Sequence, residues 1–267
     1  MAESRRAARR LTPALSRAGR GRDARDGAAC SGPNPGATGG AGTAPGGLYR
    51  LFAWLSPGFP VGAFSYSHGL EAAVASGAVH NRVSLQSWTA AVVVRGSGRV
   101  DADILRDAHR AAAAGDLAGL TAANQRGHAY RATAELALEA AAQGAAFLAT
   151  CRAAWPDAFL DRWAATGDRI CYAAVVGAAA AGAGIVLADA LVGYLEAMAA
   201  NLVSAGLRLG MIGQTDGQRI LAALEPVVVV AAADAATRDP ADFGAATFAV
   251  DLASMAHETQ YTRLFRS

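Results

Sequence analysis

The sequence predicts an all-α fold, an irregular multi-helix bundle of about nine or ten helices without a β-sheet. Apolar residues recur at helical spacing after residue 48, these stretches are rich in alanine, and no clear pair of strands is present. The chain has 267 residues, of which 53% are hydrophobic, so it is long enough to bury a sizeable core.

The first 47 residues differ from the rest of the chain. Residues 1–46 hold eight arginines and three acidic residues, a net charge of +5, which leaves −3 for the remainder because the whole chain carries +2. Residues 30–47 are rich in Gly and Pro. We therefore expect a disordered extension over 1–47 and ordered structure from about Leu48. An arginine-rich start is able to contact nucleic acid or anionic membrane, but a disordered tail or a misassigned start is the favoured interpretation.

Charge and cysteine content indicate the compartment and the kind of partner. The mildly acidic remainder argues against a nucleic-acid-binding domain. The apolar stretch of an export signal is missing near the N-terminus. The cysteines are odd in number and widely spaced, which fits a reducing cytosol: Cys30, Cys151 and Cys171. We expect a cytoplasmic protein.

Two long segments have the pattern of amphipathic helices. In 99–114, the apolar face is formed by Val100, Ile104, Ala108 and Ala111, beside Asp103, Asp107 and Arg110. In 131–154, the apolar face is formed by Leu136, Ala140, Phe147, Leu148 and Cys151, beside a polar stripe of Glu135, Glu139 and Gln143. Gly115-Asp116 and Pro156-Asp157 mark breaks between helices.

The uncharged segment 170–188 and two valine runs leave alternatives open. Residues 170–188 carry no charge over nearly the length of a membrane span, but their Ala and Gly content favours a helix buried in the bundle. The valine runs at 92–94 and 227–230 are compatible with short buried strands, although their surroundings favour helix. Thr215 and Gln218 have capping-box spacing, which predicts a helix starting after Thr215.

Known catalytic and ligand motifs are missing. Gly177 and Gly182 have the spacing of a phosphate-binding loop, but Ala183 and Gly184 follow where Lys and Ser or Thr are required. His257-Glu258 begins a zinc-protease motif whose second histidine position holds Tyr261. The histidines are scattered, so no metal ligands are assigned: His68, His80, His109, His128 and His257. We expect a non-catalytic protein without a stably bound cofactor.

Two segments have the composition of binding surfaces. Ser56–Glu71 (SPGFPVGAFSYSHGLE) contains Pro57 and Pro60, which forbid a continuous helix, and several glycines and rings, which suit a rigid aromatic loop. Residues 257–267 (HETQYTRLFRS) interleave aromatic side chains with arginine, the residue types enriched in interface hot spots. For both segments, packing onto the chain's own domain is the alternative.

On the basis of these two segments and one further motif, the chain from about Leu48 to Ser267 resembles the UreF family of urease accessory proteins. Ser56–Glu71 is similar to the family signature SP-x-x-PVG-x-FSYS-x-GLE. Residues 202–224 (LVSAGLRLGMIGQTDGQRILAAL) resemble a second signature with a GQ-x-x-GQ core, and the ending RLFRS resembles the family C-terminus. Ala137 departs from the pattern, since the family often has Arg there.

The resemblance implies an all-α homodimer with a domain over 48–256 and a partner-binding tail over 257–267. It implies a complex with the GTPase UreG and the scaffold UreD, also called UreH, which acts on apo-urease and inserts nickel at the expense of GTP hydrolysed by UreG. Nickel would be handled transiently. No contact with nucleic acid or membrane is expected.

The resemblance, together with the composition of the loop and the tail, also indicates roles for individual residues. Those expected at the partner-facing surface are Phe64, Tyr66, Glu71, His257, Tyr261, Arg263, Leu264 and Phe265. Those expected to be structural or interfacial are Pro57, Pro60, Gly69, Gln214 and Gln218. An all-α enzyme and a membrane-associated helical protein remain the alternative functions.

Overall fold

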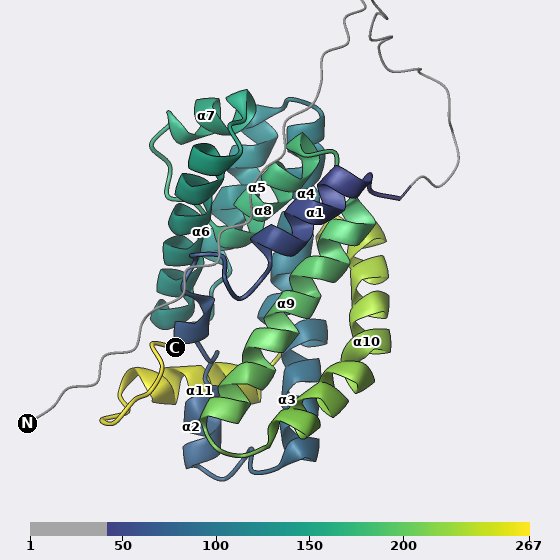
Figure 1. The fold of residues 1–267 in the computed structure, drawn as a ribbon. Coiled ribbons are helices and arrows are strands. Elements are labelled where there is room, and N and C mark those ends of the chain that lie inside the picture. The colour runs from purple at the N-terminus through teal and green to yellow at the C-terminus, as the bar shows by residue number, and fades with distance from the viewer. Residues whose placement is uncertain (1–41) are drawn as a thin grey trace, which may run out of the picture. The chain divides into compact units, whose positions relative to one another are not determined.

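The computed structural model describes residues 42–267, and the predicted all-α class is confirmed over this range. No strand occurs in these residues. Short 3₁₀ helices lie at Ala63–Ser65 and Pro240–Asp242. The α-helices shown in Figure 1 are α1 Pro45–Trp54, α2 Leu70–Ala75, α3 Arg82–Arg95, α4 Ser97–Ala113, α5 Leu117–Ala129, α6 Ala134–Ala154, α7 Ala158–Ala164, α8 Tyr172–Gly182, α9 Leu187–Arg208, α10 Gln214–Thr237 and α11 Phe248–Glu258.

The first described helix begins earlier than the composition predicted. Helix α1 starts at Pro45 rather than near Leu48, with proline in the first helical turn, where its missing N–H is not needed. Thr43 ties this start to α9, because its amide donates to Asp189 and its hydroxyl accepts from the amide of Val186. The predicted disorder of the N-terminal extension otherwise lies outside the described residues.

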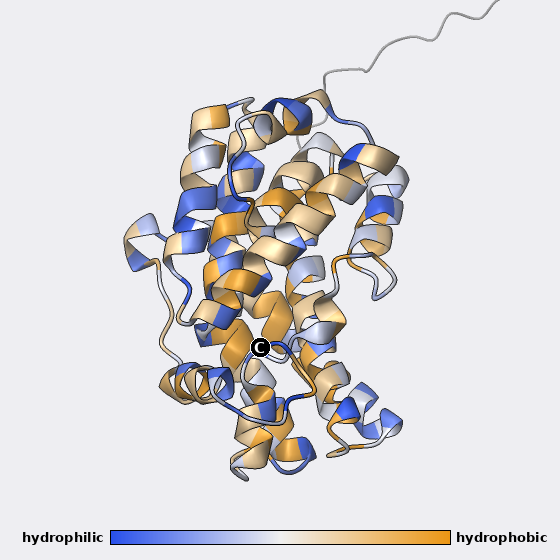
Figure 2. Ribbon diagram, turned by 90° about the vertical axis from the view of Figure 1, so that its left-hand side faces the viewer, coloured by the Kyte–Doolittle hydropathy of each residue, from blue (hydrophilic) through white to orange (hydrophobic). Residues whose placement is uncertain are grey.

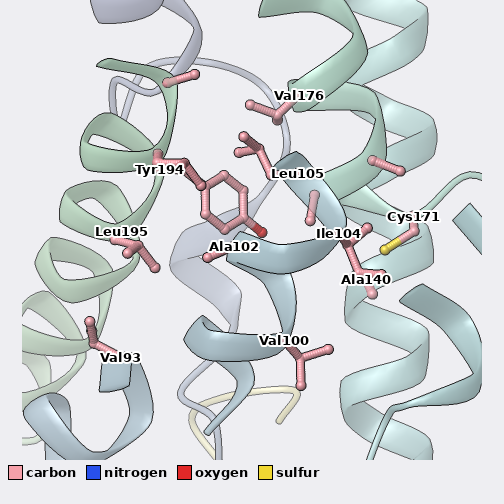
Figure 3. Close-up of a cluster of buried hydrophobic side chains, with 14 of the residues drawn as sticks. Val93, Val100, Ala102, Ile104, Leu105, Ala140, Cys171, Val176, Tyr194 and Leu195 are labelled. Carbon is pink, nitrogen blue, oxygen red and sulfur yellow. The ribbon is translucent and has the colours of Figure 1, made fainter. Parts of the chain in front are cut away.

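Helix α8, from the uncharged segment 170–188, is buried at the centre of the bundle as expected. It packs against α4 and α6 (Figure 1). A side chain at Gly177 would collide with the carbonyl oxygen of Leu105, so glycine is what lets α8 approach α4 this closely. Figure 3 shows Ile104, Leu105 and Val176 at this contact. In Figure 2, hydrophobic segments gather along the central helices.

Four of the eleven described α-helices, α3, α5, α6 and α7, begin at a side-chain cap. Asp116 and Asp157 accept backbone N–H groups at the starts of α5 and α7, at the two predicted breaks. The valine runs lie in α3 and α10, so they are helical. Thr215 is not a cap: α10 begins at Gln214 after Gly213, and no side chain caps it.

Helices α9 and α10 are long and apolar enough to cross a membrane by length and composition alone. They pack against each other in the bundle, and 50% of the apolar window of α9 is buried, against 33% for α10. Core helices of soluble proteins meet the same criterion, so these two helices are weak evidence for a membrane.

Candidate partner-binding site

The C-terminal tail folds back onto the bundle after α11. Figure 1 shows this yellow segment returning from α11 toward the start of α2. The amide of Arg266 donates to the carbonyl oxygen of Ser65 at 2.8 Å, and the amide of Ser67 donates to that of Ser267 at 2.7 Å. The tail therefore pairs, backbone to backbone, with the end of the aromatic loop.

Glu71, in the first turn of α2, binds the backbone of the C-terminal tail. Its carboxylate is buried and accepts the backbone N–H groups of Leu264 at 2.7 Å and Phe265 at 2.9 Å. Hydrogen bonds to an ionised acceptor are roughly twice as strong as neutral ones. Glu71 is thus an anchor for the tail.

His257, at the end of α11, links two acidic side chains. Its imidazole is fully buried, with Nδ1 2.7 Å from Glu135 and Nε2 3.2 Å from Glu71. Arg263 forms an ion pair with Glu135 at 2.6 Å. The end of α11 and the tail are therefore fastened to both α2 and α6.

The polar stripe predicted on 131–154 faces this tail. Glu139 and Gln143 are buried, and Glu139 accepts a hydrogen bond from the Ser267 hydroxyl at 2.9 Å. His68 lies 2.9 Å from the other Glu139 oxygen. Burial alone would lower the pKa of His68, but the charge of Glu139 and its hydrogen bond outweigh burial and raise that pKa.

The eight residues expected at a partner surface divide into two groups. Tyr66, Glu71, His257 and Phe265 are buried within the monomer, whereas Phe64, Tyr261, Arg263 and Leu264 are exposed. Phe265 packs beneath the guanidinium of Arg208, 4.5 Å from its ring centre. In this conformation Glu71, His257 and Phe265 take part in the contacts that hold the tail, and only the exposed four of the eight are open to a partner.

The residues expected to be structural or interfacial have separate positions. Gly69 has φ +73°, and a side chain there would lie 2.6 Å from the amide of Ser254 in α11, so glycine is required for α2 to meet α11. Pro57 and Pro60 are exposed on the loop that walls a cavity. Gln214 and Gln218 are exposed in the first turns of α10, outside the tail contacts.

Helix α11 shows an arrangement that the sequence reasoning missed. Its buried residues are Val250, Ser254 and His257, whereas Phe248, Leu252 and Met255 are 82%, 63% and 49% exposed. Both sets are spaced i, i+4, i+7, so each set occupies one face. The outward face is the apolar one, the reverse of an ordinary surface helix. The spacing was visible in the sequence, but the side that faces the bundle was not.

We use "α11 face" for Phe248, Leu252 and Met255, and "tail rim" for Phe64, Tyr261, Arg263 and Leu264. Exposed apolar side chains gathered on one face of a helix, as on α11, are typical of protein–protein interaction sites. Within residues 42–267, no group of three or more His, Cys, Asp or Glu side chains has the arrangement of a metal site. The histidines closest to the tail are instead bonded to glutamates.

Fold and site together define an all-helical protein that displays an apolar face on its last helix and an anchored C-terminal tail. The sequence profile of the UreF family matches residues 79–225. The urease accessory protein UreF of Bradyrhizobium sp. strain ORS 278 is 48% identical over 233 residues, 87% of this chain and 96% of that protein. UreF of Azorhizobium caulinodans is 49% identical over 225 residues, 84% and 97% of the two chains. The chain belongs to the UreF family of urease accessory proteins.

Proposed function

We propose that this protein acts in urease maturation as a docking component. It holds the scaffold UreD/UreH and the GTPase UreG on apo-urease while nickel is inserted. Support for the process comes from the relatives, which are named urease accessory proteins. Support for docking comes from one observation, the outward apolar face of α11.

The α11 face is suited to burial against another protein. Fully burying a side chain of the Leu, Phe or Met type stabilises a complex by about 1.5–3 kcal/mol. Phe248, Leu252 and Met255 are all partly or largely in water in the monomer, so much of this free energy is still available. In this proposal the α11 face and the tail rim both contact the scaffold.

Arg263 adds a charged group to the tail rim. It is exposed and is paired with Glu135. Arginine beside aromatic and aliphatic side chains is the composition of an interface hot spot. Glu71 holds the tail backbone and Glu135 holds the Arg263 side chain before a partner arrives, and such preorganisation lowers the entropy lost on binding.

The chemistry in this proposal belongs to the partners. GTP hydrolysis takes place in UreG, in keeping with the missing lysine of a phosphate-binding loop after Gly182. Nickel passes through the complex as cargo. The protein works as a cytoplasmic homodimer without a stably bound cofactor.

A co-purification experiment tests the docking surface. The triple variant Phe248→Ser, Leu252→Ser, Met255→Ser removes the apolar face while leaving the buried side of α11 intact. We expect recovery of the UreD/UreH scaffold on the tagged protein to fall at least tenfold, with unchanged helical circular dichroism.

The matched control is the double variant Tyr49→Ser, Phe52→Ser on α1, whose side chains are similarly exposed. This variant should recover the scaffold as the unmodified chain does. Equal recovery with the α11 triple variant would remove the α11 face from the proposal. Deleting residues 257–267 is a poorer test, because it also removes the buried side chains of His257 and Phe265.

A further inference from the structure

Helix α11 carries an acidic side chain, Asp251, beside its outward apolar face. Asp251 lies three residues after Phe248 and four before Met255, and these are the spacings at which helical side chains are neighbours. It is half-buried in the monomer, whereas Phe248 is 82% exposed. The opposite border of the α11 face holds two exposed alanines, Ala249 and Ala256. The α11 face is therefore bordered by a negative charge on one side and by small side chains on the other.

The other acidic side chains around α11 already have partners. Glu258, on the same helix, accepts a backbone N–H at 2.9 Å at the start of α6. Glu71 and Glu135 both contact His257, and both also hold the tail. Burial raises the pKa of the Asp251 carboxyl, and no positive side chain within residues 42–267 counteracts this shift. Asp251 is thus the acidic residue of this surface that lacks a counter-charge among the described residues.

Docking at the α11 face would remove more water from Asp251. Its side chain is a neighbour of Met255 on the helix surface, so a partner that covers Met255 also covers part of Asp251. An ionised carboxylate that loses water without gaining a counter-charge is strongly destabilised. A positive side chain placed opposite the carboxylate offsets this loss and selects against partners that lack one. A partner with a positive group at this border therefore fits the α11 face better than a purely apolar partner.

A second copy of the chain does not supply this positive group through α11. In a two-fold symmetric pair the α11 face of one copy would meet that of the other. Helix α11 contains no arginine, and its one histidine, His257, is fully buried on the opposite side. Self-pairing would bring two negative borders into one interface and leave both without a counter-charge. The charges of α11 therefore favour a different protein as the occupant.

We propose that the α11 face docks into an apolar groove of the partner that is bordered by an arginine or lysine, and that this residue pairs with Asp251. The pairing rests on the proposed docking function and adds a charge that the partner must carry. At the other border, Ala249 and Ala256 are small enough for the opposite wall of the groove to approach the helix backbone closely.

Asp251 also has a local role that the experiment must separate from pairing. It lies in the first turn of α11, where a negative charge stabilises the helix through the helix dipole. Urea denaturation of the isolated chain measures this local role, whereas binding to a partner measures the pairing. We expect Asp251→Asn to shift the urea midpoint only slightly.

Binding of the purified UreD/UreH scaffold to the full chain, followed by biolayer interferometry, tests the pairing. Asp251→Asn should speed dissociation about tenfold or more, because removing one member of a desolvated ion pair acts mainly on the dissociation rate. Asp251→Glu keeps the charge and should dissociate more slowly than Asp251→Asn. Asp234→Asn, at an exposed carboxylate of α10, is the matched control and should bind as the unmodified chain does. Unchanged dissociation of Asp251→Asn would overturn the pairing.

A charge exchange identifies the partner's residue. Asp251→Arg should weaken binding more than Asp251→Asn, because like charges then face each other across the interface. Changing the paired arginine or lysine of the scaffold to aspartate should restore binding of Asp251→Arg. A complete scan of the scaffold's basic residues without such a restoration would overturn the proposal.

The α11 triple variant separates the pairing from the docking function itself. Loss of binding in the triple variant together with full binding by Asp251→Asn would refute the pairing and leave the docking function in place. Unchanged binding in the triple variant would refute both. If the isolated chain forms a dimer that the triple variant dissociates, a second copy is the occupant and the proposal is overturned.

Discussion

The carboxylate of Glu71 accepts the backbone N–H of Phe265 at 2.9 Å, across a sequence separation of 194 residues. This contact joins the first turn of α2 to the chain's last residues. It also separates two roles within one short tail, because Phe265 points inward at 3% exposure while its neighbour Leu264 is 61% exposed.

The first prediction concerns Glu71 itself. The Glu71 carboxylate accepts hydrogen bonds from two backbone N–H groups and contacts the His257 imidazole. Glu71→Gln removes its negative charge, so we expect the free energy of unfolding to fall by about 2 kcal/mol or more. Urea denaturation measures this loss, and hydrogen exchange at the amides of Leu264 and Phe265 should accelerate. Glu225→Gln, on an exposed carboxylate of α10, is the control and should change neither quantity. Unaltered exchange in Glu71→Gln would mean that other contacts hold the tail.

The second prediction separates stability from binding at adjacent positions. Phe265→Ala empties a buried site beneath Arg208 and should cost about 3–5 kcal/mol of stability. Leu264→Ala should change stability by less than about 0.5 kcal/mol but weaken scaffold binding. Thermal unfolding and a pull-down of both variants provide the measurements. A large stability loss in Leu264→Ala would assign that side chain to the fold instead of the tail rim.

The third prediction uses two glycines with the same backbone conformation. Gly69 has φ +73° and Gly77 has φ +77°, but only a side chain at Gly69 would meet α11. Gly77→Ala should therefore cost about 1 kcal/mol from backbone strain, whereas Gly69→Ala should cost about 3 kcal/mol and detach α11. Chemical denaturation compares the two directly. Similar losses would show that the contact between α2 and α11 adjusts easily.

The fourth prediction is a pH dependence from the pair His68 and Glu139. The folded-state pKa of His68 lies above its ordinary value of 6.5. Its stabilising contribution is therefore fully present below pH 6.5 and is lost as the pH rises through the raised pKa. The urea midpoint should decline over that interval, and His68→Gln should flatten the decline. A decline of equal slope in the variant would assign the pH dependence to another group.

The sequence by itself determined the class of fold and the family. Helical periodicity in 99–114 and 131–154 requires no knowledge of neighbours, because it depends only on 3.6 residues per turn. The breaks at Gly115-Asp116 and Pro156-Asp157 were readable for a similar reason, because turn residues act locally; the structure adds that Asp116 and Asp157 cap the helices that follow. The motif at Ser56–Glu71, together with residues 202–224 and the ending RLFRS, indicated the family. The composition of the loop and of the tail indicated candidate binding surfaces.

Only the tertiary structure decided which side chains of these motifs face inward. Glu71, His257 and Phe265 had the composition of an exposed interface, but contacts between α2, α6 and the tail bury them. Phe248, Leu252 and Met255 had the spacing of a core face, yet α11 turns Ser254 and His257 toward the bundle. Periodicity specifies that two faces exist, whereas the direction of each face depends on partners brought together from distant parts of the chain.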